Sequence, residues 1–568
     1  MVNTPMRELK PRRFSFDFKW VLILGIVAFL LIFQVLPLFY MLYRAFFVDG
    51  HFSLAAFSRI YTYSLNWTAL QNTLIAATFA MIFGTLLAFP LAWLVGRTNL
   101  YFKKFFRSLF VMTYMVPPYL GAMAWLRLLN PKVGNLNVFL RDLLGLAENP
   151  FNIYSLGGLI WVLTSFYYPY AFITISRAME KMDPSLEEAS KISGASPLRT
   201  LWTVTLPMMT PSIVAGALLV FVSAASCYGI PSIVGTPGNI HTVTTRIVNY
   251  VSIGNAEGLT DATCMAVFLM LMAVMILYTS DFVTGRKQYI TVSGKSTRPN
   301  IVDLGRWRIP VTLLVILFTV IVIILPFSTV ALTSFTQNLG KPITAPGNFT
   351  LKHWEKVFTR SDILMSMGNS LFYGAIAATA GILIACAMAY LLTRTRAKGR
   401  HIPDFLITLG SGSPSVVIAL GLIMTMSGRF GISIYNTPYI MIIAYLIKYQ
   451  MMGMRTVVSA MSQIHVSLEE SSQVSGASWL RTMKNITLPL IGPSIAAGWF
   501  LIFIPSFYEL SMSALLYSSN TKVIGVQLHE YWTFTSQQQA SAMAFGILMI
   551  VVLLNVVLNR ITKGNFSI

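Results

Sequence analysis

The feature that most constrains this chain is a series of long apolar runs that recur over its whole length. A helix needs about 20 predominantly apolar residues to cross the hydrocarbon core of a bilayer. Only 11% of the residues are charged, about half the share of a soluble globular protein. The sequence therefore predicts about twelve membrane-spanning helices, at residues 20–43, 67–96, 106–126, 153–176, 212–235, 262–282, 311–335, 368–393, 403–427, 437–460, 494–517 and 539–559.

The basic residues indicate how these helices are oriented. The net charge is +21, and most of the 41 Lys and Arg residues fall on the loops of one side once the spans are threaded in order. Cytoplasmic loops carry such an excess in membrane proteins. We therefore expect both termini in the cytoplasm, a chain surrounded by membrane lipid, and no nucleic-acid partner.

A long string occurs twice in the chain. EEASKISGASPLRTLWTVTLP runs from Glu187 to Pro207, and EESSQVSGASWLRTMKNITLP runs from Glu469 to Pro489. Each copy lies at the same place in a set of six predicted spans, and an even number of spans keeps both sets in the same orientation. The predicted fold is an all-α integral membrane protein of two parallel six-helix repeats, with a first repeat at 1–284, a cytoplasmic linker at 285–309 and a second repeat at 310–568.

Each copy of the string predicts two short helices joined by a bend, within loops at about 180–211 and 461–493. Ser467 and Glu470 have the spacing of a capping box, as do Ser185 and Glu188. Gly194 and Gly476 lie where a helix ends with a residue at positive φ, and Pro207 and Pro489 are expected to mark the return to the membrane. Two matching polar loops favour the interpretation that each binds a matching cleft on a cytoplasmic partner. The alternative is a loop that only joins two spans.

Both strings resemble the EAA loop in permease subunits of type I ABC importers, whose pattern is Glu-Ala-Ala, three residues, Gly and a later Ile-x-Leu-Pro. The second copy has Ser where the family has Ala, which keeps the small size. The whole chain is similar to the two-half permeases of ferric iron importers. The matching positions are Glu187, Glu188, Ala189, Gly194, Leu206 and Pro207 in the first copy, and Glu469, Glu470, Ser471, Gly476, Leu488 and Pro489 in the second.

The resemblance implies a set of partners. In that family the loop is a coupling helix seated in a cleft of an ATPase subunit, so Glu188 and Glu470 would pair with basic groups of two ATPase copies. ATP and magnesium would be bound by those subunits, and a substrate-binding protein would deliver cargo from outside the bacterial inner membrane. This chain is expected to hold no cofactor, metal or catalytic residue. Gly294-Lys295-Ser296-Thr297 lacks the upstream Gly of a P-loop, because position 289 is Tyr.

Ionisable groups inside spans are candidates for the translocation path. Lys448 and Glu509 are such groups, and Tyr508 and Tyr228 accompany them. Lys448 and Glu509 could pair or line the path; alternatively, Lys448 snorkels and Glu509 lies at a hydrated helix end. His529-Glu530-Tyr531 offers ferric-type ligands, although a helix edge that touches a binding protein is the favoured interpretation.

The sequence thus predicts a permease that moves cargo to the cytoplasm by alternating access, with ferric iron as the leading cargo. Thiamine, a polyamine or 2-aminoethylphosphonate are alternatives, because the loops carry no information on cargo. A secondary transporter is a different class with the same repeat number, but it requires several buried carboxylates for proton coupling.

Overall fold

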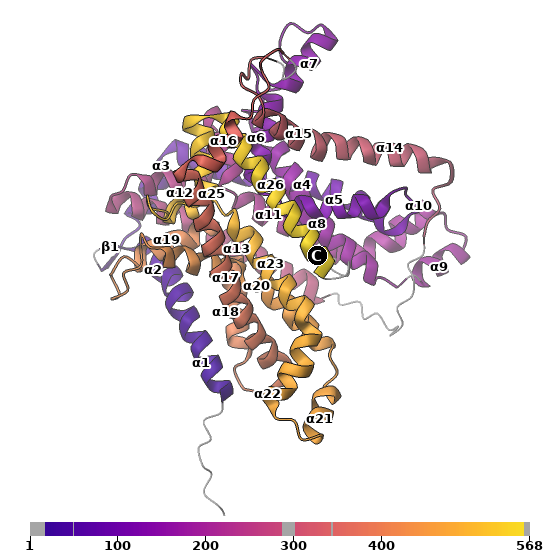
Figure 1. Cartoon of the computed structure of the whole chain (residues 1–568), viewed down its shortest axis with the longest axis vertical. Coiled ribbons are helices and arrows are strands. Elements are labelled where there is room, and N and C mark those ends of the chain that lie inside the picture. Colours follow the sequence, from indigo (N-terminus) through magenta and orange to yellow (C-terminus); the bar gives the residue numbers. More distant parts are fainter. Residues whose placement is uncertain (1–17, 49, 184, 287–300, 342–344, 562–568) are drawn as a thin grey trace, which may run out of the picture.

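The computed structural model describes residues 18–48, 50–183, 185–286, 301–341 and 345–561, most of them in helices (Figure 1). Among these residues, nine helices are long and apolar enough to cross a membrane, and two more candidate spans are helix pairs bent by 102° and 108°. Helix α20 (Pro438–Gln463), which contains Lys448 and Arg455, is the remaining predicted span. All twelve predicted spans thus correspond to a helix or a bent pair.

The two repeats have matching elements. Three pairs of long helices have equal lengths, with 34 residues in α4 and α17, 26 in α8 and α20, and 20 in α11 and α23. The first repeat contains α1 (Phe18–Leu30), α2 (Leu36–Phe46), β1 (Phe47–Val48), β2 (His51–Phe52), α3 (Ala55–Thr62), α4 (Ser64–Arg97), α5 (Lys103–Tyr114), α6 (Pro118–Leu129), α7 (Asn135–Leu144), α8 (Leu156–Lys181), α9 (Ser185–Ile192), α10 (Pro197–Thr200), α11 (Leu206–Ala225), α12 (Val243–Ser252) and α13 (Ala256–Arg286).

The second repeat follows the same order. It contains α14 (Arg308–Thr319), α15 (Leu325–Ser334), α16 (Lys352–Thr359), α17 (Ser361–Arg394), α18 (His401–Gly412), α19 (Ser415–Thr425), α20, α21 (Ser467–Val474), α22 (Trp479–Thr482), α23 (Leu488–Phe507), α24 (Ser513–Leu516), α25 (Ile524–Glu530) and α26 (Gln537–Ile561). Among the described residues, α7 has no counterpart, and it forms part of the projection at the upper end of Figure 1.

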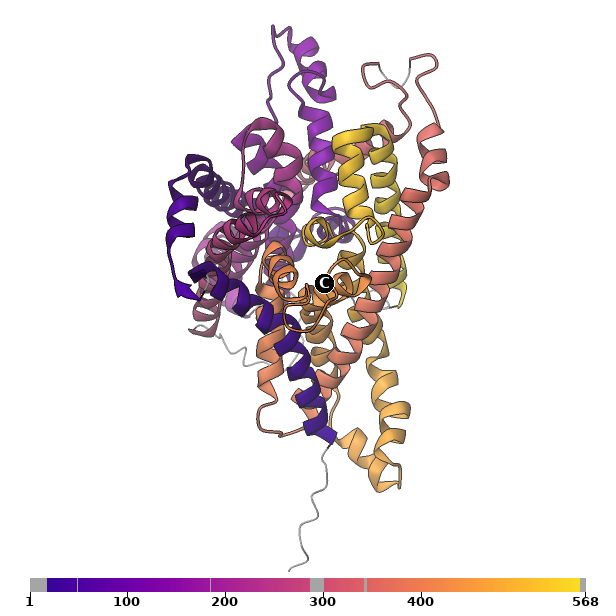
Figure 2. The ribbon, with the colours of Figure 1, turned by 90° about the vertical axis from the view of Figure 1, so that its left-hand side faces the viewer.

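The first span of each repeat packs against the other repeat. We call α1–α2 and α14–α15 the two arms. The first arm lies on α18 and α19, where Gln34 Nε2 donates to the Leu406 carbonyl at 2.5 Å (Figure 2). The second arm lies on α6 and α8, where the Phe318 and Tyr168 ring centroids are 5.6 Å apart. Each repeat therefore completes its core with an arm from the other one.

Four predicted spans differ from the structure at one point each. The spans at 106–126 and 403–427 are sharply bent pairs, broken just before α6 and α19, whose N-caps are Pro117 and Pro414. Proline has no N–H for a continuing helix, and the residue before it avoids the helical region. The spans at 212–235 and 494–517 end early, at Ala225 and Phe507, and the segments that follow form short separate helices.

Candidate functional site

The repeated string forms a short helix, a glycine bend and the start of a long helix, once in each repeat. Figure 1 shows α9 and α21–α22 projecting from the helical body. Gly194 has φ +79° and Gly476 has φ +85°, as predicted, and an added Cβ at either would meet nothing within 4 Å. The backbone conformation alone therefore requires glycine there.

The predicted capping box is wrong in the second copy. Val466 is the N-cap of α21, and the Ser467 hydroxyl contacts His465 Nδ1 at 2.8 Å instead of capping the helix. After the bend, Ser478 caps α22 by accepting from the Arg481 amide at 3.4 Å. His465, two residues earlier, competes for the Ser467 hydroxyl, and the Ser-x-x-Glu spacing gives no indication of it.

Pro207 and Pro489 do not break the helices that contain them. The helix that begins near the bend continues through both prolines, as one helix over Leu198–Ala225 and one over Trp479–Phe507. A π-helical turn ends two residues before each proline, at Leu201–Thr205 and Met483–Thr487. Proline in a regular helix clashes with the carbonyl four residues earlier, and that carbonyl lies here inside the wider π turn.

The two glutamates of each copy have opposite environments. Glu187 and Glu469 are buried, whereas Glu188 and Glu470 are exposed. Because neighbouring helix positions point in different directions, one glutamate of each pair faces the protein and the other faces outward. The residue expected to meet an ATPase is thus the outward one in both copies.

Each buried glutamate is held by an arginine and a threonine, a set that we call the clamp. Glu469 Oε1 accepts from Arg394 Nε at 3.0 Å and from Thr487 Oγ1 at 3.1 Å. Arg394 also donates to the carbonyl of Ile464, past the end of α20, at 2.9 Å. The guanidinium therefore ties the repeated loop to the ends of two long helices.

The first repeat has the same clamp with looser ion-pair geometry. Glu187 Oε1 accepts from Thr205 Oγ1 at 2.8 Å, while Arg97 Nη1 lies 3.6 Å from Glu187 Oε2. Arg97 donates to the Met179 carbonyl of α8 at 2.6 Å. Sequence reasoning did not assign these arginines; the signal was the recurrence of Arg97-Thr98 as Arg394-Thr395.

The outward surface of each loop carries one strongly exposed aliphatic side chain beside its glutamate, among exposed polar residues. Ile192 is 88% exposed and Val474 is 89% exposed, and both lie at the tip beside the bend. Ala189 and Ser471 are exposed on the same short helices, whereas Leu206 and Leu488 lie in the continuing helices. Other exposed apolar side chains of the two loops include Leu186, Leu198 and Trp202 in the first repeat, and Val466, Leu468, Trp479 and Leu480 in the second.

A cavity of about 420 Å³ lies between the two repeats. Both bent pairs, both helices α8 and α20, and the outer ends of α11 and α23 contribute to its wall. Lys448, Tyr508 and Glu509 line it, so the structure brings together three of the four predicted path residues. Lys448 and Glu509 have separate partners: Lys448 Nζ donates to the carbonyls of Ser411 at 3.0 Å and Ser413 at 2.7 Å.

Tyr228 lines a different pocket of about 570 Å³ near α25. His529, Glu530 and Tyr531 also line it but have separate partners there, respectively the hydroxyl of Ser232 at 3.1 Å, the ammonium of Lys522 at 2.6 Å and the carboxylate of Asp362 at 2.7 Å. Burial lowers the pKa of His529 to about 4. Among the described residues, no three His, Cys, Asp or Glu side chains are placed to hold one metal ion.

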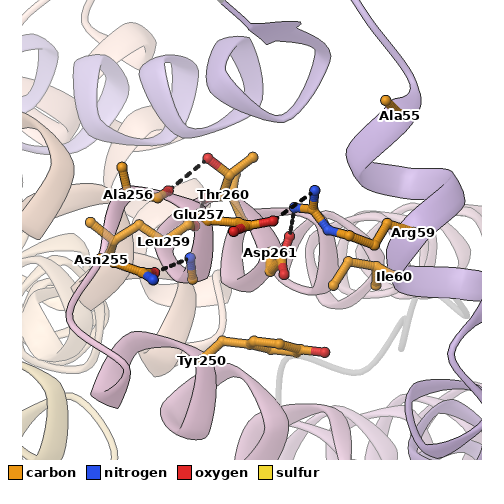
Figure 3. A network of polar contacts seen from close by, with 12 residues as sticks. Ala55, Arg59, Ile60, Tyr250, Asn255, Ala256, Glu257, Leu259, Thr260 and Asp261 are labelled. Atoms are coloured by element: carbon orange, nitrogen blue, oxygen red, sulfur yellow. Dashed lines mark hydrogen bonds and ion pairs between the residues drawn. The ribbon is translucent and has the colours of Figure 1, made fainter.

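An ion-pair network joins α3 to α13 in the first repeat (Figure 3). Arg59 Nη1 lies 3.0 Å from Glu257 Oε1, and Arg59 Nη2 pairs with Asp261. The corresponding helices α16 and α26 of the second repeat pack together too. The network fixes the segment that follows the first arm, and the sequence alone gave no signal for it.

Two fused helical repeats, a cavity between them and a pair of protruding loops define a membrane transport permease. The sequence profile of the family described as "Binding-protein-dependent transport system inner membrane component" matches residues 88–290 and 377–564. The chain belongs to this family, as a permease subunit with both halves in one polypeptide. It is a multi-pass membrane protein.

Several relatives match most of the chain. It is 24% identical over 495 residues to a ferric transport system permease protein of Actinobacillus pleuropneumoniae, a match that covers 86% of this chain and 70% of the relative. It is 26% identical over 488 residues to an Fe(3+)-transport system permease protein of Haemophilus influenzae, covering 85% and 87%. A solved bacterial ABC transporter involved in alginate import is 19% identical, covers 46% of this chain and 98% of that chain, and has a TM-score of 0.37.

Proposed function

We propose that this chain is the membrane subunit of an importer that carries ferric iron to the cytoplasm, driven by two copies of a separate ATPase. An extracytoplasmic binding protein would deliver the iron. The observation that supports this most directly is the pair of coupling loops, alike in backbone, clamp and exposed tip. Two equivalent tips could each bind one of two equivalent ATPase subunits.

Each tip has one strongly exposed aliphatic side chain that a socket on a protein partner could cover. A nearly fully exposed Ile192 or Val474 gains free energy when it is covered, at about 25 cal/mol per Å² of apolar surface. One exposed carboxylate per tip, Glu188 or Glu470, would pair with a basic group at the rim of that socket. Closure of the two ATPase subunits would then press the loops together and rock the repeats between outward-open and inward-open states.

Ferric iron is the cargo that the relatives favour, because the ferric permeases match over 85% or more of this chain. A spermidine/putrescine permease of Salmonella typhimurium matches 45% of the chain, and a molybdenum permease of Haemophilus influenzae matches 39%. Polyamines, thiamine and 2-aminoethylphosphonate therefore remain alternatives within the same class. Because the chain belongs to the binding-protein-dependent transport family, the secondary-transporter alternative is rejected.

Uptake of radioactive ferric iron tests both parts of the proposal. A strain that lacks this gene and the other iron routes is complemented with the wild type or with Glu188→Arg plus Glu470→Arg. We expect the wild type to restore uptake and the double variant to abolish it at equal membrane abundance. Glu148→Arg plus Glu355→Arg, at two exposed sites outside the loops, is the matched control.

The two possible failures are distinct. If the wild type restores no iron uptake under iron limitation, the iron assignment is wrong, and the other cargoes should be assayed in the same strain. If the double variant transports iron as well as the control does, the exposed glutamates are not part of the coupling contact.

A further inference from the structure

The charges in the central cavity belong to one repeat only. Aligning the ends of α8 and α20 places Phe166 opposite Lys448, and both line the cavity. Aligning α11 with α23 in the same way places Cys227 opposite Glu509. Among the lining residues, Lys448 and Glu509 carry the only formal charges. The first repeat therefore supplies a neutral wall and the second a charged one.

Of these two charged groups, the Glu509 carboxylate already accepts hydrogen bonds from the protein itself. Glu509 Oε2 accepts from the Met512 amide at 3.0 Å, the Ser513 amide at 2.9 Å and the Ser513 hydroxyl at 2.8 Å, and Oε1 accepts from the Met512 amide at 2.9 Å. Oε2 accepts from three protein donors and Oε1 shares one of them, so this carboxylate has less acceptor capacity left for a cation than an unpaired one has.

The Lys448 ammonium, in contrast, keeps hydrogen-bonding capacity for a ligand. Lys448 has three N–H donors, and the two carbonyls between α18 and α19 hold Nζ at the cavity wall. One donor stays available for a ligand. The surrounding wall adds tyrosine and serine hydroxyl groups that can also donate, among them those of Tyr449, Tyr508 and Ser226.

We propose that this cavity recognises its cargo through anionic oxygen atoms, so that iron passes as a ferric complex with an anionic chelator and not as the bare ion. The identity of the metal rests on the proposed function; the preference for anionic oxygens rests on the cavity. A bare trivalent ion or a polyamine would meet the ammonium with like charge. A phosphate or phosphonate presents the same oxygens without iron and is the other source of this chemistry.

Equilibrium binding to the full chain in lipid nanodiscs tests the proposal. The probes are ferric citrate labelled with radioactive iron, inorganic phosphate, 2-aminoethylphosphonate and spermidine. We expect at least one of the three anionic probes to bind and spermidine not to compete with it. Lys448→Met should weaken anion binding by about ten- to hundredfold, the range of one charge-assisted hydrogen bond.

Matched variants separate recognition from folding. Lys448→Arg keeps the charge and should keep most of the affinity, while Lys104→Met removes one exposed charge elsewhere and should change nothing. Tyr508→Phe removes one hydroxyl without changing the shape of the side chain and should weaken binding by severalfold, which keeps the test valid if Lys448→Met does not fold.

Each possible result either supports or overturns the proposal. Binding of ferric citrate that depends on Lys448 supports both the proposal and the iron assignment. Binding of phosphate or phosphonate alone supports recognition of anionic oxygens and overturns the iron assignment. Binding of none of the three anionic probes, binding that is indifferent to Lys448→Met and Tyr508→Phe, or preferential binding of spermidine overturns the proposal.

Discussion

Removing the carboxylate of the second clamp should loosen its coupling loop more than any other single change in that loop. Glu469→Ala leaves the Arg394 guanidinium buried without its partner, with Arg394 and Glu469 side chains only 6% and 9% exposed. Breaking a buried ion pair in this way costs about 3–5 kcal/mol. Glu187→Ala should cost less, about 1.5–3 kcal/mol, because Arg97 and Glu187 are 3.6 Å apart and the Thr205 hydrogen bond is the main loss.

Hydrogen exchange of the α9 and α21 amides measures this difference. About 1.4 kcal/mol corresponds to a factor of ten in an opening equilibrium, so Glu469→Ala should speed exchange in α21 by about a hundredfold or more, up to the limit of full opening. Glu470→Ala on the same helix removes an exposed carboxylate and is the control. Equal exchange in the Glu469→Ala and Glu470→Ala variants would refute the clamp, and a larger effect for Glu187→Ala would refute the distance argument.

Three further expectations follow from the geometry. Gly476→Ala should destabilise the loop by about 1–2 kcal/mol through its positive φ alone, seen as weaker co-purification with the ATPase, whereas Gly368→Ala inside α17 should not weaken it. His529 has a folded pKa of about 4, below the ordinary 6.5, so stability present above pH 6.5 should be lost as pH falls toward 4; thermal unfolding of His529→Gln should lack this dependence. Gly410→Ala should force the buried Gln34 side chain to shift, since its Cβ would lie 2.5 Å from Gln34 Oε1, and lower the thermal midpoint relative to Gly492→Ala, which meets nothing.

Much of the fold could be predicted from the sequence, because hydropathy and an internal repeat report on it directly. The glycine bends were predictable for a local reason: Gly194 and Gly476 lie where only a residue tolerant of positive φ fits. The bends at Pro117 and Pro414 were missed, since an apolar run has the same hydropathy whether the helix is straight or broken. The exchange of arms was also missed, because no local pattern indicates which repeat a helix covers.

The candidate site, like the fold, could be predicted from the sequence only in part. The loop residues were predicted as a group, but the different roles of Glu187 and Glu188 depend on which helix face meets Arg97, a residue far away in sequence. The shared cavity of Lys448 and Glu509 followed from their apolar context, while the amides that satisfy Glu509 come from a short helix that hydropathy assigned to the span.

The exchanged arms have a consequence for how the chain is made. Gln34 in the first arm contacts a carbonyl that lies 372 residues later in the sequence. At about 5–20 residues per second, ribosomal synthesis needs on the order of half a minute to reach that point. During this interval the first arm can pack on α13 of its own repeat, but its surface on α18 and α19 is missing, so it reaches its final packing only after those helices have been translated.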